Sequence, residues 1–178
     1  MKMKMKVPYI ASAAIAALLL ATNARADDEL QANSQQAVAD FLKTDPTMKR
    51  FFDESAGYAV FPDVGKGGLI VGGARGKGLV YERTNLVGQA TMTQGSVGAQ
   101  VGGQTFAEII FFENPVALDD FKAGKLEMSA EVSAVAAAEG TSRTARYKMG
   151  VVVFTLPKKG LMVQASVGGQ KFKFEPLR

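Results

Sequence analysis

The side chains best suited to ligand chemistry in this sequence are three basic residues set among glycines. Lys66, Arg75 and Lys77 lie within twelve residues, and Gly72–Gly78 reads GGARGKG. Positive charge beside exposed backbone N–H groups suits an anionic headgroup. Ordinary solvated loop charge is the simpler interpretation of this pattern. The functional hypothesis is that these three residues form a small cationic rim for a lipid headgroup.

The same glycine-lysine segments do not match the patterns of a nucleotide site. Gly76-Lys77 is followed by Gly78, and Gly65-Lys66 by Gly67, where a phosphate loop requires Ser or Thr. No glycine cluster clearly opens a helix after a strand, as a dinucleotide fingerprint requires. Turns and strand kinks explain these glycines better.

Catalytic chemistry has few candidates because the chain contains neither His nor Cys. The commonest general base, the commonest metal ligand and the thiolate nucleophile are therefore missing. Glu108 stands out because it interrupts an apolar run, and we interpret it as part of a polar strand face rather than as a functional carboxylate. We predict a non-catalytic protein with no cofactor and no metal.

The first 26 residues are typical of a secretory signal peptide. Three lysines precede an apolar stretch from Val7 to about Ala21, and Ala24-Arg25-Ala26 supplies the small residues of a cleavage site. Cleavage after Ala26 leaves residues 27–178 as a single domain. Four of the 21 basic residues precede Asp27, so the remaining 17 balance the 17 acidic ones. A neutral mature chain gives no indication of nucleic-acid binding.

Two helices are expected at the start of this domain. Apolar residues recur at helical spacing from Asp28 to Thr44, and a second, short helix begins at Asp45-Pro46 and stops near Gly57. The favoured interpretation is a lid on a sheet. The alternative makes Phe51-Phe52 a membrane-contacting element.

Glycine-rich strands follow. From Ser96 to Phe112 apolar residues occupy the odd positions, and polar residues or glycines occupy most even ones, which is the period of a half-buried strand. Seventeen residues would exceed about 50 Å if straight, so the strand must bend. The expected strand-kink glycines are Gly98, Gly102, Gly103, Gly168 and Gly169.

The remaining pattern completes an α+β fold. Asn114-Pro115 opens an inserted helix that ends at Gly124. Leu126–Ala138 has the composition of a helix but alternates like a strand, and we predict a strand. Other predicted strands are Tyr58–Phe61, Leu69–Val71, Leu79–Tyr81, Leu86–Met92 and a closing hairpin of Tyr147–Leu156 with Leu161–Phe174. Together they predict a strongly curved, mainly antiparallel sheet or partial barrel, with N-terminal helices and one inserted helix.

Two groups of motifs stand out: Gly57–Pro62 (GYAVFP) with Lys66–Gly68 and Gly76–Gly78, and Ser96–Gln104 (SVGAQVGGQ) with Glu108–Phe112 (EIIFF). They resemble the opening motif and the central signature of the SYLF domain family, also called the Ysc84 domain. The likeness runs from about Gln31 to Phe174. The chain lacks the Trp that family members often carry near Leu86–Gln89.

The resemblance implies a lipid-binding module, because eukaryotic members bind phosphoinositides and bacterial members are exported. It transfers no catalytic residues. The expected function is binding of phospholipid in the bacterial cell envelope, in the periplasm or peripheral to the outer membrane. Acyl chain would lie against the concave apolar face of the sheet, with Lys66, Arg75 and Lys77 near the headgroup. Two alternatives stay open: a structural protein that binds a protein or cell-wall partner, and a small outer-membrane β-barrel.

Overall fold

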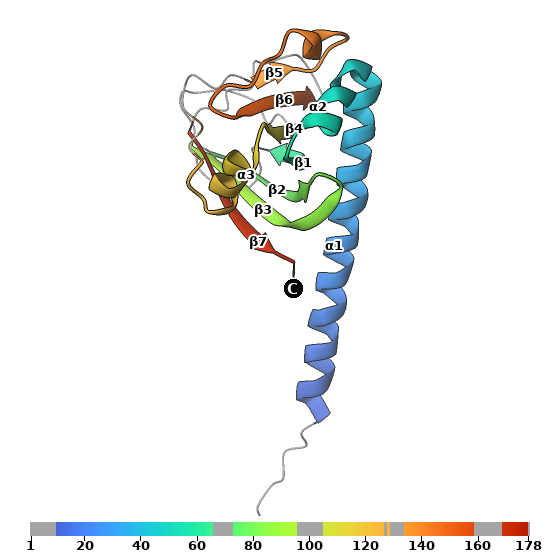
Figure 1. Cartoon of the computed structure of the whole chain (residues 1–178). Helices are drawn as coiled ribbons and strands as arrows, with labels where there is room; N and C mark the ends of the chain where they lie inside the picture. The colour runs from blue at the N-terminus through green and yellow to red at the C-terminus, as the bar shows by residue number, and fades with distance from the viewer. Residues whose placement is uncertain are drawn as a thin grey trace, which may run out of the picture.

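A computed structural model describes residues 10–65, 73–95, 105–126, 128, 134–158 and 169–177. This part of the chain has an α+β architecture, in which helices flank a curved seven-stranded sheet (Figure 1). The predicted fold class is confirmed. The elements are α1 (Ile10–Thr44), η1 (Pro46–Met48), α2 (Lys49–Glu54), β1 (Gly57–Gly65), β2 (Gly73–Glu82), β3 (Asn85–Gly95), β4 (Thr105–Phe112), α3 (Pro115–Lys122), β5 (Ala134–Ala136), η2 (Thr141–Arg143), β6 (Val151–Pro157) and β7 (Gln170–Pro176).

The sheet is open, and its strand order is β5-β6-β4-β1-β2-β3-β7. Every neighbouring pair is antiparallel except β5 with β6. The predicted hairpin between Tyr147–Leu156 and Leu161–Phe174 is wrong for the described strands, because β6 pairs with β4 and β5 whereas β7 pairs with β3. Strand β7 lies at one edge of the sheet, and β6 lies next to β5 at the other edge. The alternation of apolar and polar residues along a strand does not determine which strand it pairs with.

Strand β1 is longer than the sequence predicted. It continues past Pro62-Asp63 to Gly65, and its pairing with both neighbours shifts register between Val60 and Val64. Proline has no N–H to donate to a ladder, and a bulge accommodates it. The bulge also changes the parity of the strand, so Phe61 and Val64 both reach the same core.

Strand β2 begins inside the segment that was expected to be a glycine-rich loop. Residues 73–78 pair with β3 throughout, and Arg75–Lys77 also pair with β1. A Cβ atom at Gly78 would clash with the Val60 carbonyl oxygen and lie 2.6 Å from the Phe61 ring. The glycine therefore lets β1 and its Phe61 side chain approach β2 closely.

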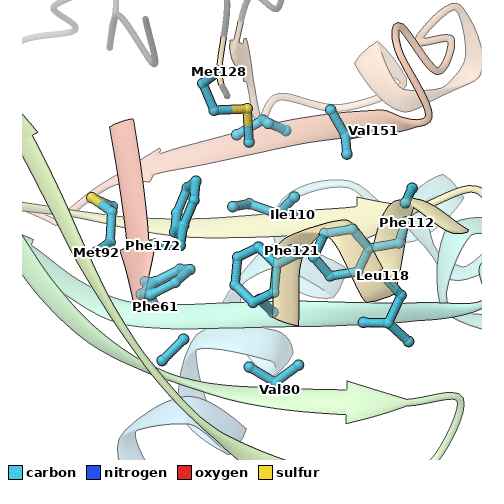
Figure 2. Packing of buried hydrophobic residues seen from close by; sticks show 14 of the residues in the cluster. Phe61, Val80, Met92, Ile110, Phe112, Leu118, Phe121, Met128, Val151 and Phe172 are labelled. Carbon is cyan, nitrogen blue, oxygen red and sulfur yellow. The ribbon is translucent and has the colours of Figure 1, made fainter. Parts of the chain in front are cut away.

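Helix α3 covers one face of the sheet, here called the inner face. Asn114 caps it by accepting a hydrogen bond from the Ala117 N–H at 3.1 Å, and the turn after it contains Gly124 at φ +68°. This confirms the predicted cap and stop. Phe121 packs against Phe112 and Phe172, with ring centroids 4.9 and 5.0 Å apart. Figure 2 shows these rings converging from α3, β4 and β7.

Helices α1 and α2 cover the opposite, outer face (Figure 1). Phe41 of α1 and Phe51 of α2 are buried there, and the Phe51 ring lies 5.4 Å from Phe111 of β4. The lid interpretation is confirmed. Membrane contact by Phe51 is excluded because only 3% of the residue is exposed. The first helix is longer than predicted, since α1 is continuous from Ile10.

Asp45 fastens these helices to the segment around η2. Its carboxylate accepts hydrogen bonds from the backbone N–H groups of Thr47 (3.1 Å) and Ser142 (2.8 Å). Burial alone would raise the pKa of Asp45, but the hydrogen bonds from Thr47 and Ser142 outweigh it and hold that pKa well below its usual range. The Arg50 guanidinium donates hydrogen bonds to the Ser142 and Ala145 carbonyl oxygens.

The ambiguous segment Leu126–Ala138 is a strand only at Ala134–Ala136, where β5 pairs with β6 in parallel. Leu126 and Met128 belong to neither a helix nor a strand. Residues 127 and 129–133 lie outside the described residues. The predicted strand is therefore confirmed only at its carboxyl end.

Candidate functional site

Two of the three predicted headgroup residues project from the outer face of the sheet. Along β2, Arg75 and Lys77 are exposed, whereas Ala74, Gly76 and Gly78 alternate with them and face inward. Leu79, two residues further on, shares the outer face but is buried. The two cations thus lie on the part of the outer face that remains exposed.

The strand register extends this exposed area across three strands. Arg75 of β2 is paired with Thr93 of β3, and Thr93 with Lys171 of β7. In the next row Lys77 is paired with Thr91, and Thr91 with Lys173. Residues paired across antiparallel strands point to the same side of a sheet. We call this set the cationic sheet face: Arg75, Lys77, Thr91, Thr93, Lys171 and Lys173.

The positive charges of the cationic sheet face are only partly neutralised. Lys173 forms an ion pair with Glu175 of the same strand at 2.7 Å. Asp63 is paired with Lys77 in the sheet, but its carboxylate forms an ion pair with Lys158 at 2.6 Å. Within the described residues neither Arg75 nor Lys171 forms an ion pair. The face therefore keeps a net positive charge that can attract an anionic ligand.

Most other predicted site residues cannot be placed. Lys66, Gly98, Gly102, Gly103 and Gly168 lie outside the described residues. Gly169 is described, and its φ of +75° in the turn before β7 suits the conformational freedom of glycine.

Sequence reasoning missed Lys171 and Lys173 as site residues. Their signal was the run Lys171-Phe172-Lys173-Phe174, in which charged and aromatic residues alternate. This alternation places both lysines on one face of a strand. Their proximity to Arg75 and Lys77 could not be inferred, because it depends on β7 pairing with β3.

The inner face is packed with the protein's own side chains. Phe61, Ile110 and Phe121 are completely buried there, and Figure 2 shows α3 and the labelled side chains filling the concave side. A Cβ atom at Gly88 would lie 2.5 Å from the Phe174 ring. At Gly78 and Gly88, therefore, the missing side chain makes room for a neighbouring strand and an aromatic ring and not for an acyl chain. The described cations lie on the opposite face from the expected acyl groove.

Glu108 occupies the inner face and not a solvated strand face. Both faces of β4 are buried: Ala107, Ile109 and Phe111 lie under the helices, and Ile110 and Phe112 belong to the inner core. Glu108 itself is completely buried, and desolvation raises its pKa to about 7 despite a hydrogen bond from Gln170. The predicted polar strand face is therefore wrong at this position, because α3 covers the side of β4 that the sequence left open to water.

The described residues contain no group of three His, Cys, Asp or Glu side chains that could hold a metal ion. In the same part of the chain, none of the helices combines the length and the apolar character that a membrane crossing requires.

Comparison with known proteins finds a family match over the region that contains β4, β6 and β7. Residues 93–176 match the family model described as Ysc84, Las17-binding protein actin regulator. Beta cell expansion factor A from Aeromonas veronii is 32% identical over 128 residues, which cover 71% of this chain and 49% of that protein. The chain spans about half the length of this relative. The family match includes Lys171 and Lys173, whereas Arg75 and Lys77 precede it.

Proposed function

Because the chain belongs to the SYLF (Ysc84-type) family, we propose that it is a non-catalytic module that binds anionic phospholipid in the bacterial cell envelope. The observation that carries this proposal is the cationic sheet face, on which Arg75, Lys77, Lys171 and Lys173 project from two strands on either side of β3. The signal-peptide pattern of residues 1–26 supports export to the periplasm.

The spacing of the four cations suits clustered phosphates. Neighbouring strands lie about 4.8 Å apart and alternate residues of one strand about 6.7 Å apart, so the four backbone positions span roughly 10 by 7 Å. Thr91 and Thr93 lie between the basic residues and supply hydroxyl donors. An open surface of this kind contacts several headgroups at once and needs no acyl pocket.

The expected affinity is modest. Each Lys or Arg near an anionic membrane surface contributes about 1 kcal/mol, so four contribute about 4 kcal/mol, which corresponds to a dissociation constant near 1 mM. Such binding is reversible and strongly screened by salt. It therefore fits a protein that associates with a surface rather than one that carries a lipid inside its core.

The test is cosedimentation of the purified protein with phosphatidylcholine vesicles that contain or lack phosphatidylglycerol. We expect binding only to the anionic vesicles. The double variant Arg75→Ser/Lys77→Ser removes about 2 kcal/mol of attraction and should bind about 30-fold more weakly.

The matched control is Lys125→Ser/Lys148→Ser, which removes two exposed cations from outside the cationic sheet face. This variant changes the net charge equally and should bind like the wild type. Equal losses in both variants would show that net charge alone matters. Absence of vesicle binding, together with capture of one stoichiometric protein partner, would favour a structural role instead.

A further inference from the structure

A side-chain hydrogen bond crosses the interior of the curved sheet. Gln170 Nε2 on β7 donates to Glu108 Oε2 on β4 at 3.0 Å. Strands β1, β2 and β3 separate these two strands in the sheet order, so the bond spans the concave side and not a pair of neighbours. Both side chains are buried, with 0% of Glu108 and 2% of Gln170 exposed.

This pair leaves two buried oxygens without partners in the described structure, Glu108 Oε1 and Gln170 Oε1. If Glu108 is ionised, both oxygens are acceptors and neither can donate a hydrogen bond to the other. A proton on Glu108 changes this, since a carboxylic acid and a primary amide can form a ring of two hydrogen bonds. The acid O–H then donates to the amide oxygen, while the amide N–H donates to the acid carbonyl oxygen.

Within the described part of the chain, the buried surroundings of Glu108 contain no compensating charge. The buried residues of the inner face, within the described part of the chain, come from β1, β2, β3, β4, β6, β7 and α3, together with Met128. Apart from glycines and Glu108 itself they are the following, none of which is ionisable: Ala59, Phe61, Val64, Ala74, Val80, Ala90, Met92, Ile110, Phe112, Ala117, Leu118, Phe121, Met128, Val151, Val153, Thr155, Gln170 and Phe172. Desolvation is accordingly the main cause that raises the pKa of Glu108.

We propose that Glu108 is protonated in the folded protein and ties β7 to β4 through a two-hydrogen-bond pair with Gln170, so that ionisation of Glu108 loosens the β7 edge of the sheet. Strand β7 carries Lys171 and Lys173 on its outer side. Loosening it would separate these lysines from Arg75 and Lys77. This last consequence rests on the proposed function, whereas the tie itself does not.

The tie predicts a definite dependence of stability on pH. A carboxyl group whose pKa is about 7 when folded and 4.5 when unfolded favours the folded state below pH 4.5, and this stabilisation is lost as pH rises through 7. The unfolding equilibrium constant should rise roughly 70-fold between pH 5 and pH 8. Over this window Tyr58 and Tyr147, with pKa values near 12, do not titrate.

Urea unfolding of the wild type, Glu108→Gln and Glu113→Gln at pH 5 to pH 8 tests the tie. Glu108→Gln replaces the acid by an amide that can form the same two-bond ring at every pH, so its stability should be nearly flat. Glu113 is exposed just after β4, and Glu113→Gln should keep the wild-type slope. Equal slopes in the wild type and Glu108→Gln would overturn the proposal.

A measurement on the wild type keeps the proposal testable if Glu108→Gln does not fold. The infrared carbonyl band of a protonated carboxylic acid should be present at pH 6 and disappear with a midpoint near pH 7. Its absence at pH 6 would also overturn the tie. Vesicle binding at pH 6 and pH 8 then tests whether ionisation of Glu108 affects the lysines of β7. If the infrared band titrates but binding does not change, the link between Glu108 and binding is contradicted and the tie is not. If the protein binds at neither pH, the proposed function is contradicted, but the tie between β7 and β4 is not.

Discussion

Gly78 sets the distance between β1 and β2 through the absence of a side chain. The position that a Cβ atom would take is already occupied by the Val60 carbonyl oxygen and the Phe61 ring. Gly65, in β1, is different, because the nearest described atoms to a Cβ there would be Thr105 Oγ1 at an ordinary 3.6 Å and Thr105 Cγ2 at 4.0 Å. Glycines of one sheet thus differ in whether their missing side chain is required.

We predict that Gly78→Ala lowers the free energy of unfolding by about 1–3 kcal/mol, since backbone and ring must move to admit the methyl group. Gly65→Ala should change stability by less than about 0.5 kcal/mol. Urea denaturation of both variants measures the difference. Equal losses would mean that both positions disfavour alanine for a reason other than close packing.

At the scale of elements, the outer helices are held by a few buried aromatic side chains. Phe41 of α1 is completely buried and belongs to the cluster that includes Phe51, Phe111 and Phe154. Asp45 and Arg50 then attach the following turns to η2. The α1 helix therefore depends on the sheet for its position and covers part of the outer face.

Phe41→Ala should destabilise the protein by about 3–5 kcal/mol, the usual cost of removing a buried phenylalanine. Hydrogen exchange should become faster in α1 before it does in β1 and β4, because the helix loses its main contact with the sheet. Lys43→Ala, at an exposed position of the same helix, serves as the control. Uniform acceleration throughout the sheet would contradict an independently loosened helix.

For the molecule as a whole, the two faces of the sheet differ in what they carry. The inner face holds the apolar core and the buried Glu108–Gln170 pair, and the outer face carries both the helices and the exposed cations. Substitutions of the exposed cations should therefore affect ligand binding without affecting folding. Export would deliver this arrangement intact, because the buried α1 residues Ala37 and Phe41 follow the expected cleavage position.

We predict that the protein recovered from the periplasm of an expressing bacterium begins at Asp27. Cleavage there places Asp27, Asp28 and Glu29 at the new amino end of α1, where acidic side chains favour the helix dipole. Intact mass and N-terminal sequencing measure the cleavage position. Recovery only of the chain that starts at Met1, associated with the inner membrane, would contradict a cleaved signal peptide.

The sequence alone determined the features that depend on a few neighbouring residues. Asp45-Pro46 and Asn114-Pro115 marked two helix starts correctly, and the alternation of β4 and β7 predicted strands. The motif of Glu108–Phe112, which lies within the matched residues 93–176, indicated the family. Caps, turns and strand periods arise within about four residues of the chain, so they can be read locally.

Only the tertiary structure decided which strands are neighbours and what covers each face. Lys171 and Lys173 join Arg75 and Lys77, and Glu108 meets Gln170, through pairings between segments that lie far apart in the sequence. The helix α3 turned the expected polar face of β4 into core. Strand pairing and burial are chosen by the free energy of the whole packed domain, and no local pattern contains that information.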